Sequence, residues 1–275
     1  MEHLIAEPPA ILKLAGHPVR WNLLKNLALS DERVQDLVAL LQLPQNLISY
    51  HLRLLREGRL VTERRSGADE RAVYYSLDIE QLQRYFLDAG ESLHPAIIES
   101  VHSTSPEHTP APHPEHPAPP LRVLFLCTEN SARSQMAEAL LRHLSRGTIE
   151  AYSAGSFPAG QIHPLASRYI EQVGIDMSQQ YPKHFKTFIG QHFDAIVTVC
   201  DRMRESCPTF PDDPLRIHWS FPDPASLTGP EEEQYHTFEQ IGLQLTNRIR
   251  LLITLLERER RQKQKEREIY EKGYM

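Results

Sequence analysis

Cys127 and Arg133, which are separated by five residues, are the side chains best suited to chemistry on an oxyanion. An apolar run over residues 123–126 leads into the cysteine, and a helical pattern over residues 135–144 follows the arginine. This order predicts a loop between a strand and a helix, where inward N–H groups and the helix dipole form a nest for a tetrahedral anion. Arg133 would supply a planar fork for two of the anion's oxygens.

The same positive field predicts a lowered pKa for the Cys127 thiol, which would then react as a thiolate nucleophile. The alternative is an inert, buried cysteine at the end of a core strand, and the arginine and serine that follow the loop favour the nucleophile. The other residues expected to bind or support the anion are Thr128, Glu129, Asn130, Ser131, Ala132 and Ser134.

The composition is that of a globular protein with room for two domains. The chain has 275 residues, 40% of them hydrophobic, and a net charge of -6, so any nucleic-acid binding must come from a local patch. The N-terminus does not resemble a signal peptide, and no apolar run approaches the roughly 18 residues of a membrane span. The three cysteines, Cys127, Cys200 and Cys207, indicate a reducing, cytoplasmic compartment and thiol chemistry.

Residues 102–120 contain seven prolines and almost no apolar side chains, which predicts an extended linker. Its four histidines, His102, His108, His113 and His116, are irregularly spaced, so a solvated linker is favoured over a metal site. We predict an N-terminal domain over residues 1–95, the linker over 96–120, a C-terminal domain over 121–257 and a charged extension over 258–275.

The pattern before the linker predicts a helical region that ends in a hairpin. Helices are expected over residues 11–29, 33–41 and 47–56, strands over 59–64 and 71–77, and a last helix over 79–89. This order is typical of an α+β winged helix-turn-helix, whose third helix enters the DNA major groove. The alternative is a small helical protein-interaction module with a solvated basic face.

The predicted third helix carries side chains that can hold DNA, because Gln and Asn pair with adenine and Arg binds guanine or phosphate. The candidate contacts are Gln45, Asn46, Ser49, Tyr50, His51 and Arg53 on the helix, and Arg64 and Arg65 on the hairpin. We interpret His51 as a structural residue or a contact to the DNA backbone, and not as a metal ligand.

Residues 43–61 and 73–77 resemble the ArsR-type repressors, and the likeness covers roughly residues 8–90. The resemblance implies binding to double-stranded operator DNA and a homodimer that pairs through its first and last helices. Many arsenic-sensing members bind arsenite through cysteines in the helix before the recognition turn. Residues 1–126 contain no cysteine, so this domain cannot sense arsenite in that way.

After the linker, strands alternate with helices, which predicts an α/β domain with a parallel sheet flanked by helices. The expected strands cover residues 122–126, 149–154, 193–199 and 215–219, and the expected helices cover 135–144, 164–173 and a long segment from residue 238 onward. The Cys127 loop would lie at the carboxyl end of the first strand, where such folds bind ligands.

Cys200 ends the strand at 197–199, and Cys207 follows seven residues later. If residues 201–206 are helical, the two Cα atoms lie about 10 Å apart, whereas a disulfide needs roughly 4.4–6.8 Å. A bond between them would then require this segment to unwind, and the alternative is two free core cysteines. Asp223 lies on a proline-stiffened loop at the same edge, where it is either a general acid or part of a simple turn.

The C-terminal half resembles the low-molecular-weight tyrosine phosphatase fold and, within it, the thioredoxin-coupled arsenate reductases. The likeness spans roughly residues 121–257 and rests on residues 127–138, 152–155, 199–200, 207–208 and 218–225. The phosphatases of this group typically carry proline where Gln135 stands and tyrosine where Ala225 stands, and they need no thiol pair such as Cys200 and Cys207.

The resemblance implies a thiol relay with thioredoxin as the electron donor and no bound cofactor. Arsenate would bind to Arg133, Cys127 would attack the arsenic, and Asp223 would protonate the departing oxygen. Cys200 would then attack Cys127 and release arsenite, and Cys207 would move the disulfide to 200–207. The alternatives are a protein-tyrosine phosphatase fused to a DNA-binding domain, or a regulator whose loop only senses an oxyanion.

The resemblance also implies roles for residues around the loop. Ser134 would donate a hydrogen bond to the thiolate, and Asn130 would hold the shape of the loop. Some reductases of this type hold a potassium ion near the positions of Asn130, Glu138 and Ser153, and their fourth ligand, an aspartate, aligns with Lys183. We expect the Lys183 ammonium to replace the ion.

Overall fold

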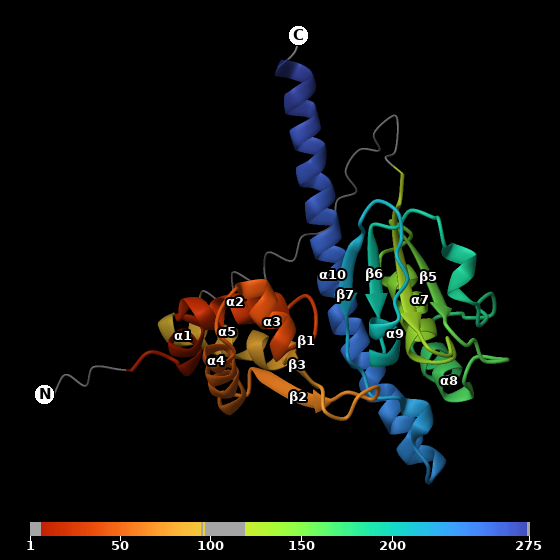
Figure 1. Cartoon of the computed structure of the whole chain (residues 1–275), viewed down its shortest axis with the longest axis horizontal. Helices are drawn as coiled ribbons and strands as arrows, with labels where there is room; N and C mark the ends of the chain where they lie inside the picture. Colours follow the sequence, from red (N-terminus) through yellow and green to blue (C-terminus); the bar gives the residue numbers. More distant parts are fainter. Residues whose placement is uncertain (1–6, 95, 97–118, 274–275) are drawn as a thin grey trace, which may run out of the picture. The chain divides into compact units, whose positions relative to one another are not determined.

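The computed structural model describes residues 7–94, 96 and 119–273, and Figure 1 shows their elements. The chain divides into two compact units, Met1–Ala118 and Pro119–Met275. Most of the predicted linker, including its four histidines, lies outside the described residues. Within the described ranges, no helix is both long and apolar enough to cross a membrane.

The N-terminal unit packs helices on one small antiparallel sheet, as a winged helix-turn-helix does. The helices are α1 (Ala10–Ala15), α2 (Pro18–Leu27), α3 (Val34–Leu41), α4 (Gln45–Glu57) and α5 (Ile79–Leu93). The strands β1 (Glu32–Arg33), β2 (Val61–Arg65) and β3 (Val73–Leu77) pair in the order β1-β3-β2. The core is rich in leucines from α2, α3 and α4, and burying each one stabilises the fold by roughly 1.5–3 kcal/mol.

The prediction of one continuous helix over residues 11–29 is wrong, because the chain breaks between α1 and α2. His17 caps α2 by accepting the Val19 N–H at Nδ1, and Pro18 occupies the first turn. Proline has no N–H with which to continue the hydrogen-bond ladder of α1, although the apolar spacing runs on across the break. The sequence pattern also misses the two-residue β1, and α5 runs to Leu93, beyond the predicted end at residue 89.

The C-terminal unit is an α/β domain with a four-stranded parallel sheet, as predicted. The strands are β4 (Leu121–Cys127), β5 (Ile149–Gly155), β6 (Ala195–Thr198) and β7 (Leu215–His218), in the order β5-β4-β6-β7. The helices are α7 (Arg133–Leu144), α8 (Pro164–Gln172), α9 (Asp201–Glu205) and α10 (Glu231–Gly273). Short 3-10 segments, η1 (Phe185–Phe188) and η2 (Pro224–Ser226), lie in the connections.

The sheet centre explains the uniformly apolar run before Cys127. Because β4 lies between β5 and β6 and is covered by helices, residues 123–126 have no solvent-exposed surface. The loop that follows β4 therefore starts from a rigid, buried strand.

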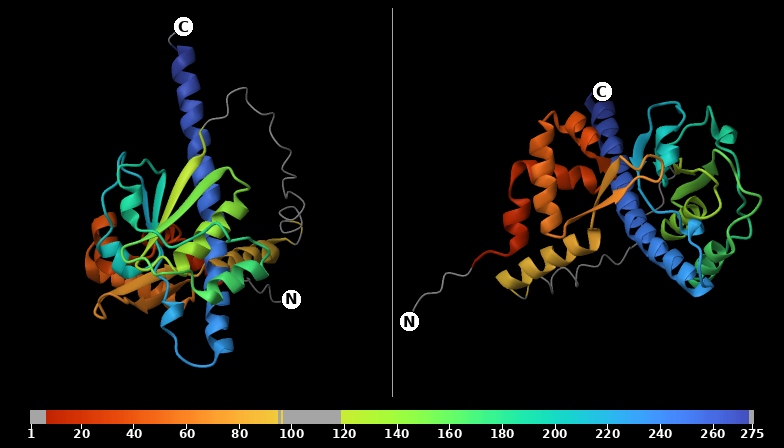
Figure 2. Two further views of the ribbon diagram at one scale, coloured as in Figure 1. Left: turned by 90° about the vertical axis from the view of Figure 1, so that its right-hand side faces the viewer. Right: turned by 60° about the horizontal axis from the view of Figure 1, so that its bottom comes forward.

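α10 packs its apolar face against the domain and then continues beyond it. A Cβ on Gly242 would lie 2.1 Å from the Tyr169 ring, so only glycine allows α10 to approach α8 this closely. The buried face ends at Leu256, and Figure 2 shows the helix running on past the sheet. α10 begins at Glu231, seven residues before the predicted start at 238, and the charged residues after 257 continue it as a mostly exposed helix.

Candidate functional site

The structure confirms a strand, loop and helix around Cys127 and Arg133. Cys127 is the last residue of β4, Arg133 is the first of α7, and both side chains are buried. Asn130 turns the loop with a φ of 51°, a left-handed conformation that asparagine tolerates better than most residues. A Cβ on Gly155 would lie 2.5 Å from the Thr128 carbonyl oxygen, so the glycine at the end of β5 leaves room for the loop.

The Cys127 sulfur has two close hydrogen-bond partners. The Asn130 backbone N–H donates to Sγ over 3.0 Å, and the Ser134 hydroxyl oxygen lies 2.8 Å from Sγ. Asn130 Nδ2 donates to the same hydroxyl oxygen over 2.9 Å, which holds the Ser134 side chain beside the sulfur. Ser134 therefore lies within hydrogen-bond distance of Cys127, and its role as donor to the thiolate stays a prediction.

The Asn130 side chain is fully paired and ties the loop to three other segments. Its second amide hydrogen goes to Ser153 Oγ over 2.8 Å. Its Oδ1 accepts from the Gln135 side chain over 3.1 Å and from the Lys183 backbone N–H over 2.8 Å. This network agrees with the prediction that Asn130 holds the shape of the loop, and it gives the buried Gln135 a structural role that sequence reasoning did not assign.

Lys183 places its ammonium beside the buried pair of Glu138 and Ser153. Ser153 Oγ donates to Glu138 Oε2 over 2.5 Å, and Lys183 Nζ lies 3.5 Å from the same oxygen. The Lys183 side chain is only 15% exposed. The Lys183 ammonium shares this carboxylate with Arg142, whose Nη2 lies 2.7 Å from Oε1, and the replacement of a potassium ion by Lys183 stays a prediction. In the described part of the chain, no cluster of His, Cys, Asp or Glu could hold a metal.

Arg133 is bonded to the predicted general acid. Its Nη2 lies 2.9 Å from Asp223 Oδ2, and its Nη1 donates to the Phe221 carbonyl oxygen over 3.0 Å. The loop after β7 therefore closes over the guanidinium, and the fork predicted to bind an oxyanion holds a carboxylate instead. Asp223 Oδ1 accepts the Ala225 N–H over 3.2 Å, which fixes the carboxylate at the start of η2.

The pKa predicted for Cys127 from the helix dipole is wrong in direction. The pKa of this thiol is raised to about 11, mainly by burial and in part by the nearby Cys200. Arg133, the Ser134 hydroxyl and the Asn130 N–H all lower the pKa, but the loss of water around a fully enclosed sulfur outweighs them. If Cys127 is the nucleophile predicted from the sequence, it must lose its proton before it attacks.

The structure brings Cys200 to the loop and leaves Cys207 apart. Cys200 is buried at the N-terminus of α9, and its Sγ lies 3.4 Å from the hydroxyl of Thr128, the residue after Cys127. Cys207 is half-buried beyond the other end of α9, and all three cysteines are free thiols. Because α9 is helical, a bond between Cys200 and Cys207 requires the segment to unwind, as the spacing predicts.

A buried polar group directly after Cys200 was not predicted from the sequence. Asp201 Oδ1 lies 3.1 Å from His218 Nε2 and accepts from Ser220 Oγ over 2.7 Å. Thr198 Oγ1 lies 2.9 Å from the other ring nitrogen of His218. This group fixes the start of α9 on β7. The sequence signal that could have revealed it is the pair of polar residues, Thr198 and His218, at the ends of the apolar strands β6 and β7.

The predicted DNA contacts on α4 are exposed, with one exception. Gln45, Asn46, Ser49, Tyr50 and Arg53 face solvent, as do Arg65 and part of Arg64 on β2. His51 is 4% exposed and packs against the His17 ring at 4.4 Å between centroids, so it does not reach DNA. Burial also lowers the pKa of His51. Of the two roles suggested by the sequence, a structural residue or a contact to the DNA backbone, the structure agrees with the first.

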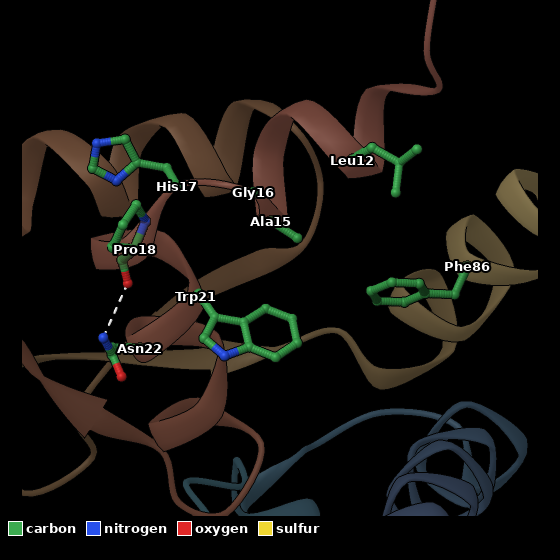
Figure 3. A pocket seen from close by; sticks show the side chains of 8 residues that line it. All are labelled: Leu12, Ala15, Gly16, His17, Pro18, Trp21, Asn22 and Phe86. Atoms are coloured by element: carbon green, nitrogen blue, oxygen red, sulfur yellow. Dashed lines mark hydrogen bonds between the residues drawn. The ribbon is translucent and has the colours of Figure 1, made fainter.

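The N-terminal unit has an apolar pocket on the side formed by α1, α2 and α5. Figure 3 shows Trp21 of α2 and Phe86 of α5 facing one another across it. The pocket has a volume of about 520 Å³, and Leu12 of α1 lies at its rim. These three large apolar side chains are 43–50% exposed, which is unusual for residues at the surface of an isolated unit.

Comparisons with known proteins match both units. Residues 122–263 match the family model described as low molecular weight phosphotyrosine protein phosphatase, and residues 17–63 match the one described as bacterial regulatory protein, arsR family. The second match covers the α2–α4 region and the start of the hairpin.

Two curated relatives and one solved structure illustrate the likeness of the C-terminal unit. The arsenate reductase of Bacillus subtilis (strain 168) is 37% identical over 128 residues, which cover 46% of this chain and 91% of the relative. That of Brevibacillus brevis is 38% identical over 123 residues, which cover 45% and 90%. The crystal structure of arsenate reductase from Archaeoglobus fulgidus DSM 4304 is 29% identical, with a TM-score of 0.40 and coverage of 48% and 98%.

Proposed function

The chain belongs to the low molecular weight phosphotyrosine protein phosphatase family, and on this basis and that of its thiols we propose that residues 121–257 form an arsenate reductase. One observation carries the proposal: the Cys200 sulfur lies 3.4 Å from the Thr128 hydroxyl, beside the nucleophile Cys127. A phosphatase that works through one thiol gains nothing from a second thiol at this place. A reductase needs it to take arsenic off the nucleophile.

Arsenate binds in the loop by replacing Asp223 as the partner of Arg133. The buried guanidinium and the inward backbone N–H groups then hold the anion's oxygens. Released from the ion pair, the Asp223 carboxyl lies beside the departing oxygen, where it passes a proton. The pair in the structure is thus the resting arrangement of both groups.

The reaction balances with three thiols and two electrons. Cys127 Sγ forms a bond to arsenic, an As–O bond breaks, and the thiol proton leaves with the departing hydroxyl as water by way of Asp223. Cys200 Sγ then bonds to Cys127 Sγ, the S–As bond breaks, and its electron pair stays on arsenic, which leaves as arsenite. Cys207 attacks Cys200, forms the 200–207 disulfide and frees Cys127 as a thiolate.

A reductant must then return two electrons to the 200–207 disulfide. Thioredoxin is suited to this step because its dithiol reduces exposed protein disulfides. Three free thiols also suit a reducing compartment, so we place the protein in the cytoplasm.

Thioredoxin-coupled arsenate turnover, compared with hydrolysis of p-nitrophenyl phosphate, tests the assignment. The wild-type chain should reduce arsenate, and Cys200→Ser should abolish this turnover while it leaves any phosphatase activity. Phosphatase activity without arsenate reduction would favour the phosphatase alternative. Tight oxyanion binding without either activity would favour a sensor.

The N-terminal unit supports a second activity, operator binding as a repressor. Its α4 presents a polar, basic face, and the exposed apolar side chains around Trp21 and Phe86 support pairing with a second copy of the chain. Because residues 1–126 lack cysteine, arsenite held on the catalytic thiols would be the signal that releases DNA. Band shifts with operator DNA, with and without arsenite, test this, and a chain that binds no DNA would end the repressor proposal.

A further inference from the structure

Arg216 touches the last thiol of the relay. It lies on β7, the edge strand of the sheet, and its Nη1 donates to Cys207 Sγ over 3.5 Å. Its Nη2 donates to the Pro208 carbonyl oxygen over 3.3 Å. The two bonds hold the guanidinium against the thiol and the backbone next to it, so the contact is specific in orientation.

We propose that Arg216 positions Cys207 and promotes the loss of its thiol proton, so that the sulfur can attack Cys200 as a thiolate. The proposal rests on the thiol relay proposed above and assigns a positioning residue to its last internal step. In that step the Cys207 thiolate bonds to Cys200 Sγ, the Cys127–Cys200 bond breaks, and Cys127 takes the electron pair. No external electrons enter, so the only requirement is a deprotonated Cys207.

Cys207 needs this help because of where it lies. Burial raises the pKa of its thiol, and Arg216 lowers it through both its charge and its hydrogen bond. Burial outweighs Arg216, so the pKa stays raised, and the thiol also donates to the Pro208 carbonyl oxygen over 3.7 Å. The guanidinium stays charged at every physiological pH, so its effect on the thiol does not change with pH. Because the thiolate is the attacking form, its population sets the exchange rate.

Arg216 and His218 hold the two ends of α9 differently. They are two residues apart on β7, so their side chains leave the same face of the sheet. His218 holds Asp201 at the start of α9 in a buried pair, with both side chains 3% exposed. Arg216 holds Cys207 past the end of α9 in an exposed contact that separates easily. In the proposed relay, the Cys207 end is therefore the one that unwinds toward Cys200 when the 200–207 bond forms.

The test measures the thiol directly, without arsenate. In the Cys127→Ser/Cys200→Ser variant, Cys207 is the only cysteine of the chain, and its alkylation by iodoacetamide is followed against pH. Arg216→Gln should slow alkylation near neutral pH by about tenfold and move the profile to higher pH. Arg216→Lys should keep most of the rate. The matched control is Arg202→Gln, which removes an exposed arginine of α9 that has no side-chain hydrogen bond or ion pair in the described ranges.

An unchanged alkylation profile in Arg216→Gln would overturn the proposal, whether or not the chain reduces arsenate. A second measurement uses the three-thiol chain in a single turnover. Arg216→Gln should release as much arsenite as the wild type but accumulate the 127–200 disulfide, and in steady-state turnover kcat should fall while kcat/KM for arsenate stays the same. Failure of the wild type to form arsenite would refute the reductase and leave the alkylation result standing. Rapid formation of the 200–207 disulfide in Arg216→Gln would refute the role of Arg216.

Discussion

Removal of the Lys183 ammonium tests whether this lysine supplies the cation that stabilises the oxyanion loop. In Lys183→Ala, the carboxylate of Glu138 loses a partner at 3.5 Å while only 4% of its side chain is exposed. A unit charge at this distance contributes about 4–5 kcal/mol at an effective dielectric constant of about 20. Arg142 still pairs with Glu138 at 2.7 Å, so the net loss of unfolding free energy should be about 2 kcal/mol.

Thermal unfolding measures this loss in sodium and in potassium buffers. For a domain of this size, about 2 kcal/mol corresponds to a fall in Tm of about 4–8 °C. Potassium should restore part of the Tm of Lys183→Ala, because the ion can bind the Ser153 hydroxyl and the Glu138 carboxylate on the side that the ammonium leaves. The wild-type Tm should be the same in both buffers.

The matched control is Lys186→Ala, which removes an exposed lysine without a side-chain hydrogen bond or ion pair in the described ranges. It should leave Tm unchanged in either buffer. The reasoning fails if Lys183→Ala is as stable as the wild type, or if potassium strongly raises the stability or activity of the wild-type chain.

Three further changes have expected outcomes. Ser134→Ala removes a hydrogen bond that lowers the pKa of Cys127. Alkylation of Cys127 should therefore move to higher pH, and arsenate turnover should fall about tenfold or more. An unchanged pH profile of alkylation would argue against the contact. Gly242→Val should lower the unfolding free energy by about 1–3 kcal/mol in urea titrations, because α10 must move away from Tyr169. Arg53→Gln should weaken operator binding and reduce the salt dependence of the binding constant by the equivalent of about one phosphate contact. If the variant and the wild type bind operator DNA with the same affinity at all salt concentrations, Arg53 does not contact DNA.

Local signals were sufficient to predict the reactive loop. The strand before Cys127 and the helix from Arg133 are encoded within about 20 residues, and a loop between them has few alternatives. The same reasoning failed at residues 11–29, because apolar spacing continues across Pro18 while the backbone N–H groups do not. The spacing of apolar side chains does not report the missing backbone N–H of a proline, so the proline must be considered separately.

Contacts between distant segments were out of reach of the sequence. Arg133 and Asp223 were each assigned a role, but their ion pair joins residues 90 positions apart and depends on how the loop after β7 folds back. The direction of the Cys127 pKa shift likewise depends on burial, which competes with the dipole and cannot be read from spacing. Arg216 carried no signal at all, because its meaning comes from lying across from Cys207 on a neighbouring element.

The most direct test of the relay is the disulfide that Cys207→Ser traps after one turnover. When the reduced variant is mixed with arsenate and no other reductant, each chain should release a single arsenite and contain a 127–200 disulfide by peptide mass mapping. The structure supports this because Cys200 lies at the loop and Cys207 is held apart by α9. Release of arsenite without a 127–200 disulfide, or no arsenite from a reduced and folded chain, would contradict the account.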